Sequence, residues 1–107
     1  AYNNLNLLAD FLLSNGVSQK KFSLFDFDKN DLPDIKFDVI ISLYSLDYHY
    51  EFSLYKDYLK KIMKPESVLI FDTIRPEYFN GIFKNVEIIK QDLNTVHKSK
   101  RIVCRNF

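Results

Sequence analysis

Glycine is scarce in this chain: among 107 residues there are only two, Gly16 and Gly81. Loops that wrap phosphates or dinucleotides need several glycines, because the backbone must turn tightly and approach the ligand closely. The chain contains neither a G-x-G-x-x-G fingerprint nor a Walker-type loop. A glycine-rich nucleotide-binding loop is therefore excluded from these residues.

Cysteine and long apolar runs are also nearly absent. Cys104 is the only cysteine, which excludes an intramolecular disulfide and a cysteine-rich metal site and favours a reducing, cytoplasmic setting. The apolar runs are far shorter than the ~20 residues of a membrane span, and no signal-peptide pattern is present. Because the net charge is only +1, we expect neither a membrane nor a nucleic-acid partner.

Apolar and aromatic residues, in contrast, are plentiful. Hydrophobic residues make up 47 % of the chain, with ten Phe and seven Tyr. Each aromatic side chain buries about 150–250 Å². We therefore predict one small domain over residues 1–107, with a core that depends on aromatic rings.

Three segments have the pattern of helices. Apolar residues at helical spacing predict a well-buried helix from Asn3 or Asn4 to Ser14 or Asn15, with Gly16 as a left-handed cap. A second apolar stripe predicts a helix over 51–64, ended by Pro65. A shorter helical turn is expected over 75–80.

Five segments have the pattern of strands. The stretch 21–27 is apolar on both faces, and 37–44 has the continuous apolar run of a central parallel strand. The others are 67–72 and two closing segments that begin at Asn85 and Ser99. Strands that alternate with helices predict an α/β fold with a mostly parallel sheet, closed by an antiparallel C-terminal pair.

Polar side chains follow the first three predicted strands. Ligands bind beyond the carboxyl ends of the strands in open α/β sheets, so these positions are candidates for a site. They are Asp26, Asp28, Lys29 and Asn30; then Ser42, Tyr44, Ser45, Asp47, Tyr48, His49 and Tyr50; then Asp72, Thr73 and Arg75. Imidazole titrates in the range of a general base, which makes His49 the catalytic candidate. The alternatives are an exposed His49, a tyrosine-rich core and an Asp72 that caps the next turn.

One long stretch resembles the middle and later part of class I S-adenosylmethionine-dependent methyltransferases. It reads "DKNDLPDIKFDVIISLYSLDYHY", followed after the next helix by "YLKKIMKPESVLIFD". An acidic strand end at Asp28, Leu32-Pro33, Phe37-Asp38 and Lys64-Pro65 come in the order of that family. The likeness covers roughly residues 20–105. The segment "SLYSLDYHY" is also similar to bacterial sugar O-methyltransferases.

The resemblance implies a Rossmann-like fold and S-adenosyl-L-methionine as cofactor. Asp28 would accept a hydrogen bond from the adenine amine, and Lys29 would offer its backbone N–H to the ring. Ser42, Leu43 and Tyr44 would line the cofactor near its methyl group. The expected reaction is methyl transfer to a hydroxyl of a small molecule or sugar. Tyr48, Asp72 and Arg75 are the candidate substrate-binding residues.

Two elements of that family are missing from these residues. The resemblance places the glycine-rich loop and the ribose-binding acidic residue upstream of Ala1, so we expect a partial domain that lacks its N-terminal strands. Two further strands would then separate 21–27 from 37–44 in the sheet. The apolar edge left without them predicts self-association, or an upstream segment that completes the sheet. A non-catalytic methyltransferase-like module and a flavodoxin-like binding domain are the rival interpretations.

Overall fold

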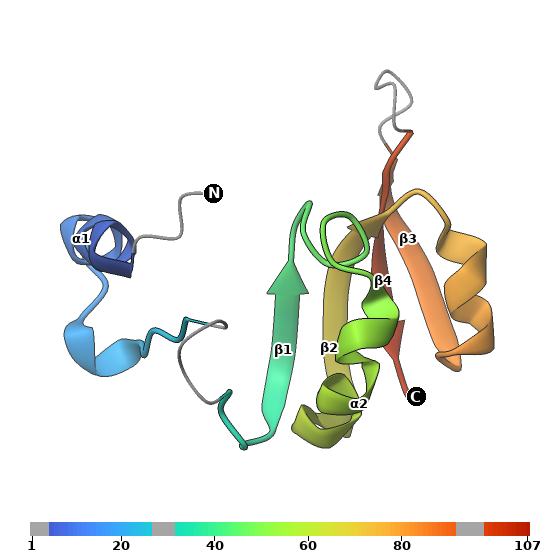
Figure 1. The fold of residues 1–107 in the computed structure, drawn as a ribbon, viewed down its shortest axis with the longest axis horizontal. Helices are drawn as coiled ribbons and strands as arrows, with labels where there is room; N and C mark the ends of the chain where they lie inside the picture. Colours follow the sequence, from blue (N-terminus) through green and yellow to red (C-terminus); the bar gives the residue numbers. More distant parts are fainter. Residues whose placement is uncertain (1–4, 27–31, 92–97) are drawn as a thin grey trace. The chain divides into compact units, whose positions relative to one another are not determined.

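The computed structural model describes residues 5–26, 32–91 and 98–107 (Figure 1). The chain forms two compact units, Ala1–Pro33 and Asp34–Phe107. The assignment of both units to one domain stays a prediction.

The described residues of the first unit form one α-helix and one short 3-10 helix. Helix α1 spans Leu5–Ser14, and η1 spans Gln19–Lys21. Gly16 follows α1 with φ +85°, and the Val17 N–H donates to the Leu12 carbonyl at 3.0 Å. A left-handed residue followed by an N–H that bonds to a carbonyl of the last helical turn is a C-terminal helix cap. The predicted left-handed cap is therefore confirmed.

Two predictions for the first unit are wrong. Helix α1 contains no buried residue, although its apolar spacing predicted a buried helix. Residues 22–26 form no strand, and Phe27 lies outside the described residues. A strand exists only where a neighbour satisfies its backbone N–H and C=O groups. In the described part of the chain no strand pairs with 22–26, so its apolar pattern alone is not sufficient.

Within 34–91 and 98–107, the second unit is built on a four-stranded open sheet in the order β1-β2-β4-β3. Its strands are β1 (Phe37–Ser42), β2 (Met63–Thr73), β3 (Asn85–Gln91) and β4 (Lys100–Arg105). Strands β1 and β2 are parallel, and β4 is antiparallel to both of its neighbours. The α/β fold and the antiparallel closing pair are confirmed, but the prediction of a mostly parallel sheet is wrong for the described strands, since only one of their three pairings is parallel. The segment predicted as the central strand is the edge strand β1; the central parallel strand is β2.

Two helical segments cover one face of this sheet. Helix α2 (Phe52–Ile62) follows β1, and η2 (Pro76–Gly81) follows β2, close to the predicted ranges (Figure 1). The Phe52 ring lies 5.7 Å from Phe71 of β2 and 5.0 Å from Phe79 of η2, between ring centroids. This aromatic cluster is the centre of the core, as the composition predicted. Helix α2 ends at Ile62, before the predicted stop at Pro65, and Pro65 lies within β2.

The two faces of the sheet carry different neighbours. Side chains alternate along each strand, so Leu69 and Phe71 point to the helix-covered face with their partners Cys104 and Ile102 on β4. We call the other side the second face. The apolar side chains on it are Val39, Ile41, Val68, Ile70 and Val103.

Candidate functional site

The carboxyl ends of β1 and β2 lie at the same edge of the sheet, since the two strands are parallel and Ser42 is in register with Phe71. The turn after β1 and the segment after β2 therefore meet. Two ion pairs connect them to each other and to β4. We call these residues the carboxyl-edge cluster: Tyr44, Asp47, Asp72, Thr73, Arg75 and Arg101.

Asp72 carries one of the two enclosed carboxylates of the carboxyl-edge cluster; its side chain is 3 % exposed, and that of Asp47 is 2 % exposed. The Asp72 carboxylate is buried and accepts hydrogen bonds from Arg101 Nε at 2.9 Å and Nη2 at 3.3 Å. It also accepts the backbone N–H of Tyr44 at 3.0 Å. Tyr44 has φ +54°, in the left-handed region that side chains other than glycine rarely adopt. The carboxylate therefore holds the first residues of the turn after β1 in a strained conformation.

Asp47 forms the second ion pair of the carboxyl-edge cluster. It accepts the Thr73 hydroxyl at 2.7 Å, and Arg75 at 3.1 Å from Nε and 2.6 Å from Nη2. Its backbone is also left-handed, with φ +67°. These contacts close the same turn at its other end. The turn is thus pinned to β2 by one buried carboxylate at each end.

Hydrogen bonds to these carboxylates raise the pKa of both guanidinium groups above the ordinary value. For Arg101 the main cause is its bond to Asp72, and for Arg75 it is its bond to Asp47. The Arg75 guanidinium also lies 4.0 Å from the Tyr78 ring centroid. Both arginines therefore remain charged at any pH at which the protein is studied.

Of the predicted cofactor residues, Ser42 is the last residue of β1, and Leu43 and Tyr44 begin the turn that follows it. Ser42 accepts the Leu46 N–H at 3.1 Å through its hydroxyl oxygen. Leu43 and Tyr44 are about half exposed, at 46 % and 50 %. Their side chains therefore retain apolar surface for a ligand, whereas Ser42 already accepts one internal bond.

Of the remaining candidates, Tyr48 and His49 lie on the same turn. The Tyr48 ring packs edge-on against Tyr44 at 6.0 Å, and its buried hydroxyl has no hydrogen-bond partner among the described residues. His49 is exposed, and its backbone N–H donates to Ser45 O at 2.9 Å. Asp28 and Lys29 lie outside the described residues, so their place beside Ser42 stays a prediction.

Sequence reasoning identified most of these positions but missed Arg101. Asp47 and Thr73 were among the polar residues after the strands, without an assigned role. Arg101 belongs to the basic tail and comes within reach of Asp72 only because β4 inserts antiparallel beside β2, where the two residues are in register. No local pattern in the sequence reports that pairing.

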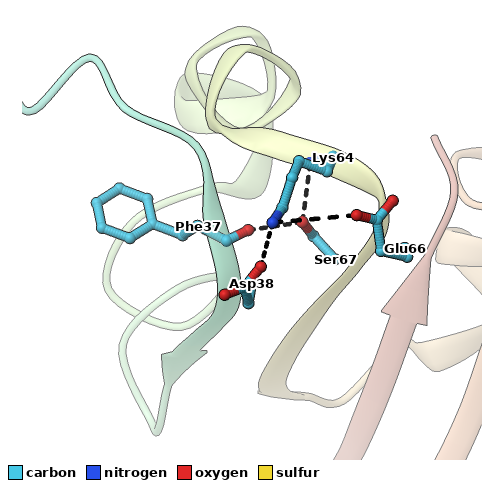
Figure 2. Close-up of polar contacts among 5 residues, drawn as sticks. All are labelled: Phe37, Asp38, Lys64, Glu66 and Ser67. Atoms are coloured by element: carbon cyan, nitrogen blue, oxygen red, sulfur yellow. Dashed lines mark hydrogen bonds and ion pairs between the residues drawn. The ribbon is translucent and has the colours of Figure 1, made fainter.

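A second polar cluster lies at the opposite end of β1 (Figure 2). Lys64 forms an ion pair with Asp38, and its Nζ lies 3.9 Å from Glu66 Oε1. The buried Ser67 hydroxyl donates to the Phe37 carbonyl at 2.6 Å and accepts the Lys64 N–H at 2.8 Å. The hydrogen bond to Asp38 raises the pKa of Lys64. These contacts tie the start of β1 to β2, which is a structural role.

Comparisons with models of known protein families, with curated proteins and with solved structures find no match. Among the described residues, no helix is both long and apolar enough to cross a membrane. Within the same part of the chain, no group of three or more His, Cys, Asp or Glu side chains is arranged to hold a metal ion.

Proposed function

We propose that this chain is the later part of a class I S-adenosylmethionine-dependent methyltransferase domain, acting on a hydroxyl of a small molecule or sugar. The support is the order of sequence motifs, from Asp28 and Leu32-Pro33 through Phe37-Asp38 to Lys64-Pro65. An antiparallel strand pair at the end of the sheet, which the resemblance implies, is also present in β3 and β4.

The observation that carries the proposal is the pinned turn after β1. A polar turn at the carboxyl end of a parallel strand is where α/β sheets bind ligands. Here the Tyr44 N–H is fixed by Asp72 at 3.0 Å, and Asp47 is fixed by Thr73 and Arg75. A turn held in this way presents Leu43 and Tyr44 in one conformation, which lowers the entropic cost of binding.

The residues of this turn fit an adenosyl ligand in their chemistry. The half-exposed Leu43 and Tyr44 offer apolar and aromatic surface, and an aromatic face also attracts a cationic group. Bound S-adenosylmethionine would supply an electrophilic methyl group next to a positive sulfur. Exposed His49 on the same turn would take the proton of the substrate hydroxyl, a contribution of about 10²–10⁴-fold.

The structure adds a role for two of the proposed substrate-binding residues. Asp72 already accepts three hydrogen bonds, so we assign it to positioning the turn. Arg75 uses two of its nitrogens on Asp47 and remains exposed, so its third nitrogen is available to an acidic substrate group. The hydroxyl of Tyr48, also predicted to bind substrate, is buried, so we assign this side chain to packing against Tyr44.

The rival function is a non-catalytic module with the same fold. The pairing of Asp47 and Asp72 with arginines of the same chain favours this rival. Buried carboxylates with a purely structural role also have their hydrogen bonds filled by neighbouring side chains. The two functions differ in one measurable property, namely cofactor affinity.

Calorimetric titration with S-adenosylmethionine and S-adenosylhomocysteine tests the proposal, on this chain and on a version extended at its N-terminus. We expect binding by the extended chain, weakened at least fivefold by L43S. The matched control is L54S, an exposed leucine on α2, which should leave the affinity unchanged. Absence of binding by both chains would leave the non-catalytic module as the function.

A further inference from the structure

Strand β4 connects the carboxyl-edge cluster to the middle of the sheet. It lies between β2 and β3 and pairs antiparallel with both of them (Figure 1). Arg101 on this strand is in register with Asp72 on β2 and with Lys90 on β3. The backbone at Arg101 is therefore anchored on both sides, and its side chain starts from a fixed point.

Arg101 grips the Asp72 carboxylate with two nitrogens. Residues directly opposite each other in an antiparallel pair have their side chains on the same face, so Arg101 lies beside Asp72 on the second face of the sheet. Nε of Arg101 contacts Oδ1 of Asp72 at 2.9 Å, and Nη2 contacts Oδ2 at 3.3 Å. Because each carboxylate oxygen receives its own nitrogen, this contact fixes the plane of the carboxylate as well as its charge.

The orientation of this carboxylate decides where Tyr44 is held. The backbone N–H of Tyr44 donates to Oδ2 of Asp72 at 3.0 Å, the same oxygen that Nη2 of Arg101 contacts. A carboxylate free to rotate about its Cβ–Cγ bond would not keep this oxygen in front of the N–H. Arg101 also lies near the Tyr44 ring, with 5.8 Å between Cζ and the ring centroid, within the range of a cation–π contact.

We propose that Arg101 is a positioning residue for the turn after β1: it orients the Asp72 carboxylate, which in turn holds Tyr44 in its left-handed conformation. That conformation, with φ +54°, is strained for tyrosine and persists only where neighbouring groups enforce it. The consequence for binding rests on the proposed function. Arg101 then sets the affinity of Leu43 and Tyr44 for the cofactor without a contact of its own to the ligand.

Lysine at position 101 separates this role from simple neutralisation of a buried charge. An ammonium group carries the same charge as a guanidinium group, but it is a single nitrogen and does not grip two carboxylate oxygens side by side. If Arg101 only neutralises Asp72, the variant R101K keeps the turn intact. If Arg101 orients Asp72, R101K keeps the charge balance and still loosens Tyr44.

Amide hydrogen exchange without ligand tests the positioning role. We expect exchange at Tyr44 to accelerate about tenfold in R101K. The Asp47 N–H, which donates to Tyr50 O at 2.7 Å near the other end of the turn, should keep its rate. The matched control is R105K, the same substitution on the same strand, which should change neither amide. An unchanged rate at Tyr44 in R101K, or an equal acceleration in R105K, would overturn the proposal.

A measurement on the native chain does not depend on how well the variants fold. A guanidinium group gripped by two oxygens rotates slowly about its Nε–Cζ bond, so the two Nη atoms of Arg101 should give separate ¹⁵N NMR signals. One averaged signal would show that the grip is absent in solution and would overturn the proposal.

Calorimetric titration of the N-terminally extended chain with S-adenosylhomocysteine tests the consequence for binding. We expect R101K to weaken the affinity at least fivefold. R105K should keep the native affinity, and so should S67A, which weakens the sheet at the opposite end of β1. Native affinity in R101K would overturn the role of Arg101 in binding and leave the proposed function standing. If the native extended chain does not bind, the proposed function fails, and exchange at Tyr44 still decides whether Arg101 positions the turn.

Discussion

Replacement of Asp72 by alanine is the most informative change to the carboxyl-edge cluster. The variant removes one carboxylate that accepts two hydrogen bonds from Arg101 and one from the Tyr44 backbone. The Arg101 side chain, only 20 % exposed, is then left as a buried charge without its partner. The Tyr44 N–H loses its acceptor while the residue remains left-handed.

The expected loss in the free energy of unfolding is about 3 kcal/mol, at the lower end of the range for breaking a buried ion pair. The lower end applies because Arg101 keeps some contact with water. In the double variant D72A/R101M neither charge remains, and the cost reduces to an unsatisfied amide, about 1–2 kcal/mol. R101M should therefore stabilise the D72A protein, although R101M alone destabilises the native chain.

Urea unfolding of the four proteins measures this cycle, with unchanged m-values as the sign that the same transition is compared. Amide exchange at Tyr44 gives a local readout, which should accelerate in D72A. If D72A costs less than 1 kcal/mol, or if the double variant equals the sum of the single ones, the cluster is not a coupled unit. The exposed Lys61–Asp34 pair is the control, with an expected loss for K61M of at most about 1 kcal/mol.

Three further predictions concern single buried groups. S67A leaves the Lys64 N–H and the Phe37 carbonyl without their partner and should cost about 2 kcal/mol in urea unfolding, whereas S53A, exposed on α2, should cost almost nothing. Y48F removes a buried hydroxyl that has no partner among the described residues, so the free energy of unfolding should stay or rise; a fall of more than 1 kcal/mol would show that the hydroxyl is bonded. Burial raises the pKa of Cys104 from 9.0 to about 12. The unfolded chain then loses this proton first, and stability should fall above pH 9 by about 1.4 kcal/mol per pH unit, a slope that C104A should lack.

Segments whose structure depends on local pattern were predicted well from the sequence. The apolar stripe of α2 places Phe52, Leu59 and Ile62 in the core, as its spacing indicated. Gly16 adopts the left-handed cap that its position after an apolar helix required. In both cases the residues that decide the structure are neighbours along the chain.

Segments whose structure depends on distant partners were predicted poorly. The apolar stretch 22–26 has the composition of a strand, but a strand needs a neighbour, and the sequence does not report whether one is present. The run in β1 is typical of a central strand, yet β1 is an edge. Both errors have the same cause. A hydrophobic pattern indicates that a segment needs burial or a neighbouring strand, but it does not show where in the sheet the partner strands lie.

The candidate site shows the same difference between features set by local sequence and features set by contacts between distant residues. The sequence predicted that polar residues after β1 and β2 would lie at one edge, because the carboxyl ends of parallel strands meet. It did not predict that Asp72 is neutralised by Arg101, since that contact depends on the insertion of β4. The identity of the positioning residues thus required the three-dimensional register.

The most direct test of the account is a ¹H–¹⁵N NMR titration of the chain extended at its N-terminus with S-adenosylhomocysteine, a method that detects even millimolar binding. The account predicts saturable shifts at the Leu43 and Tyr44 amides, with the Ile89 amide on β3 unchanged as an internal reference. Shifts absent from the turn after β1, at a ligand concentration that saturates any other response, would contradict it.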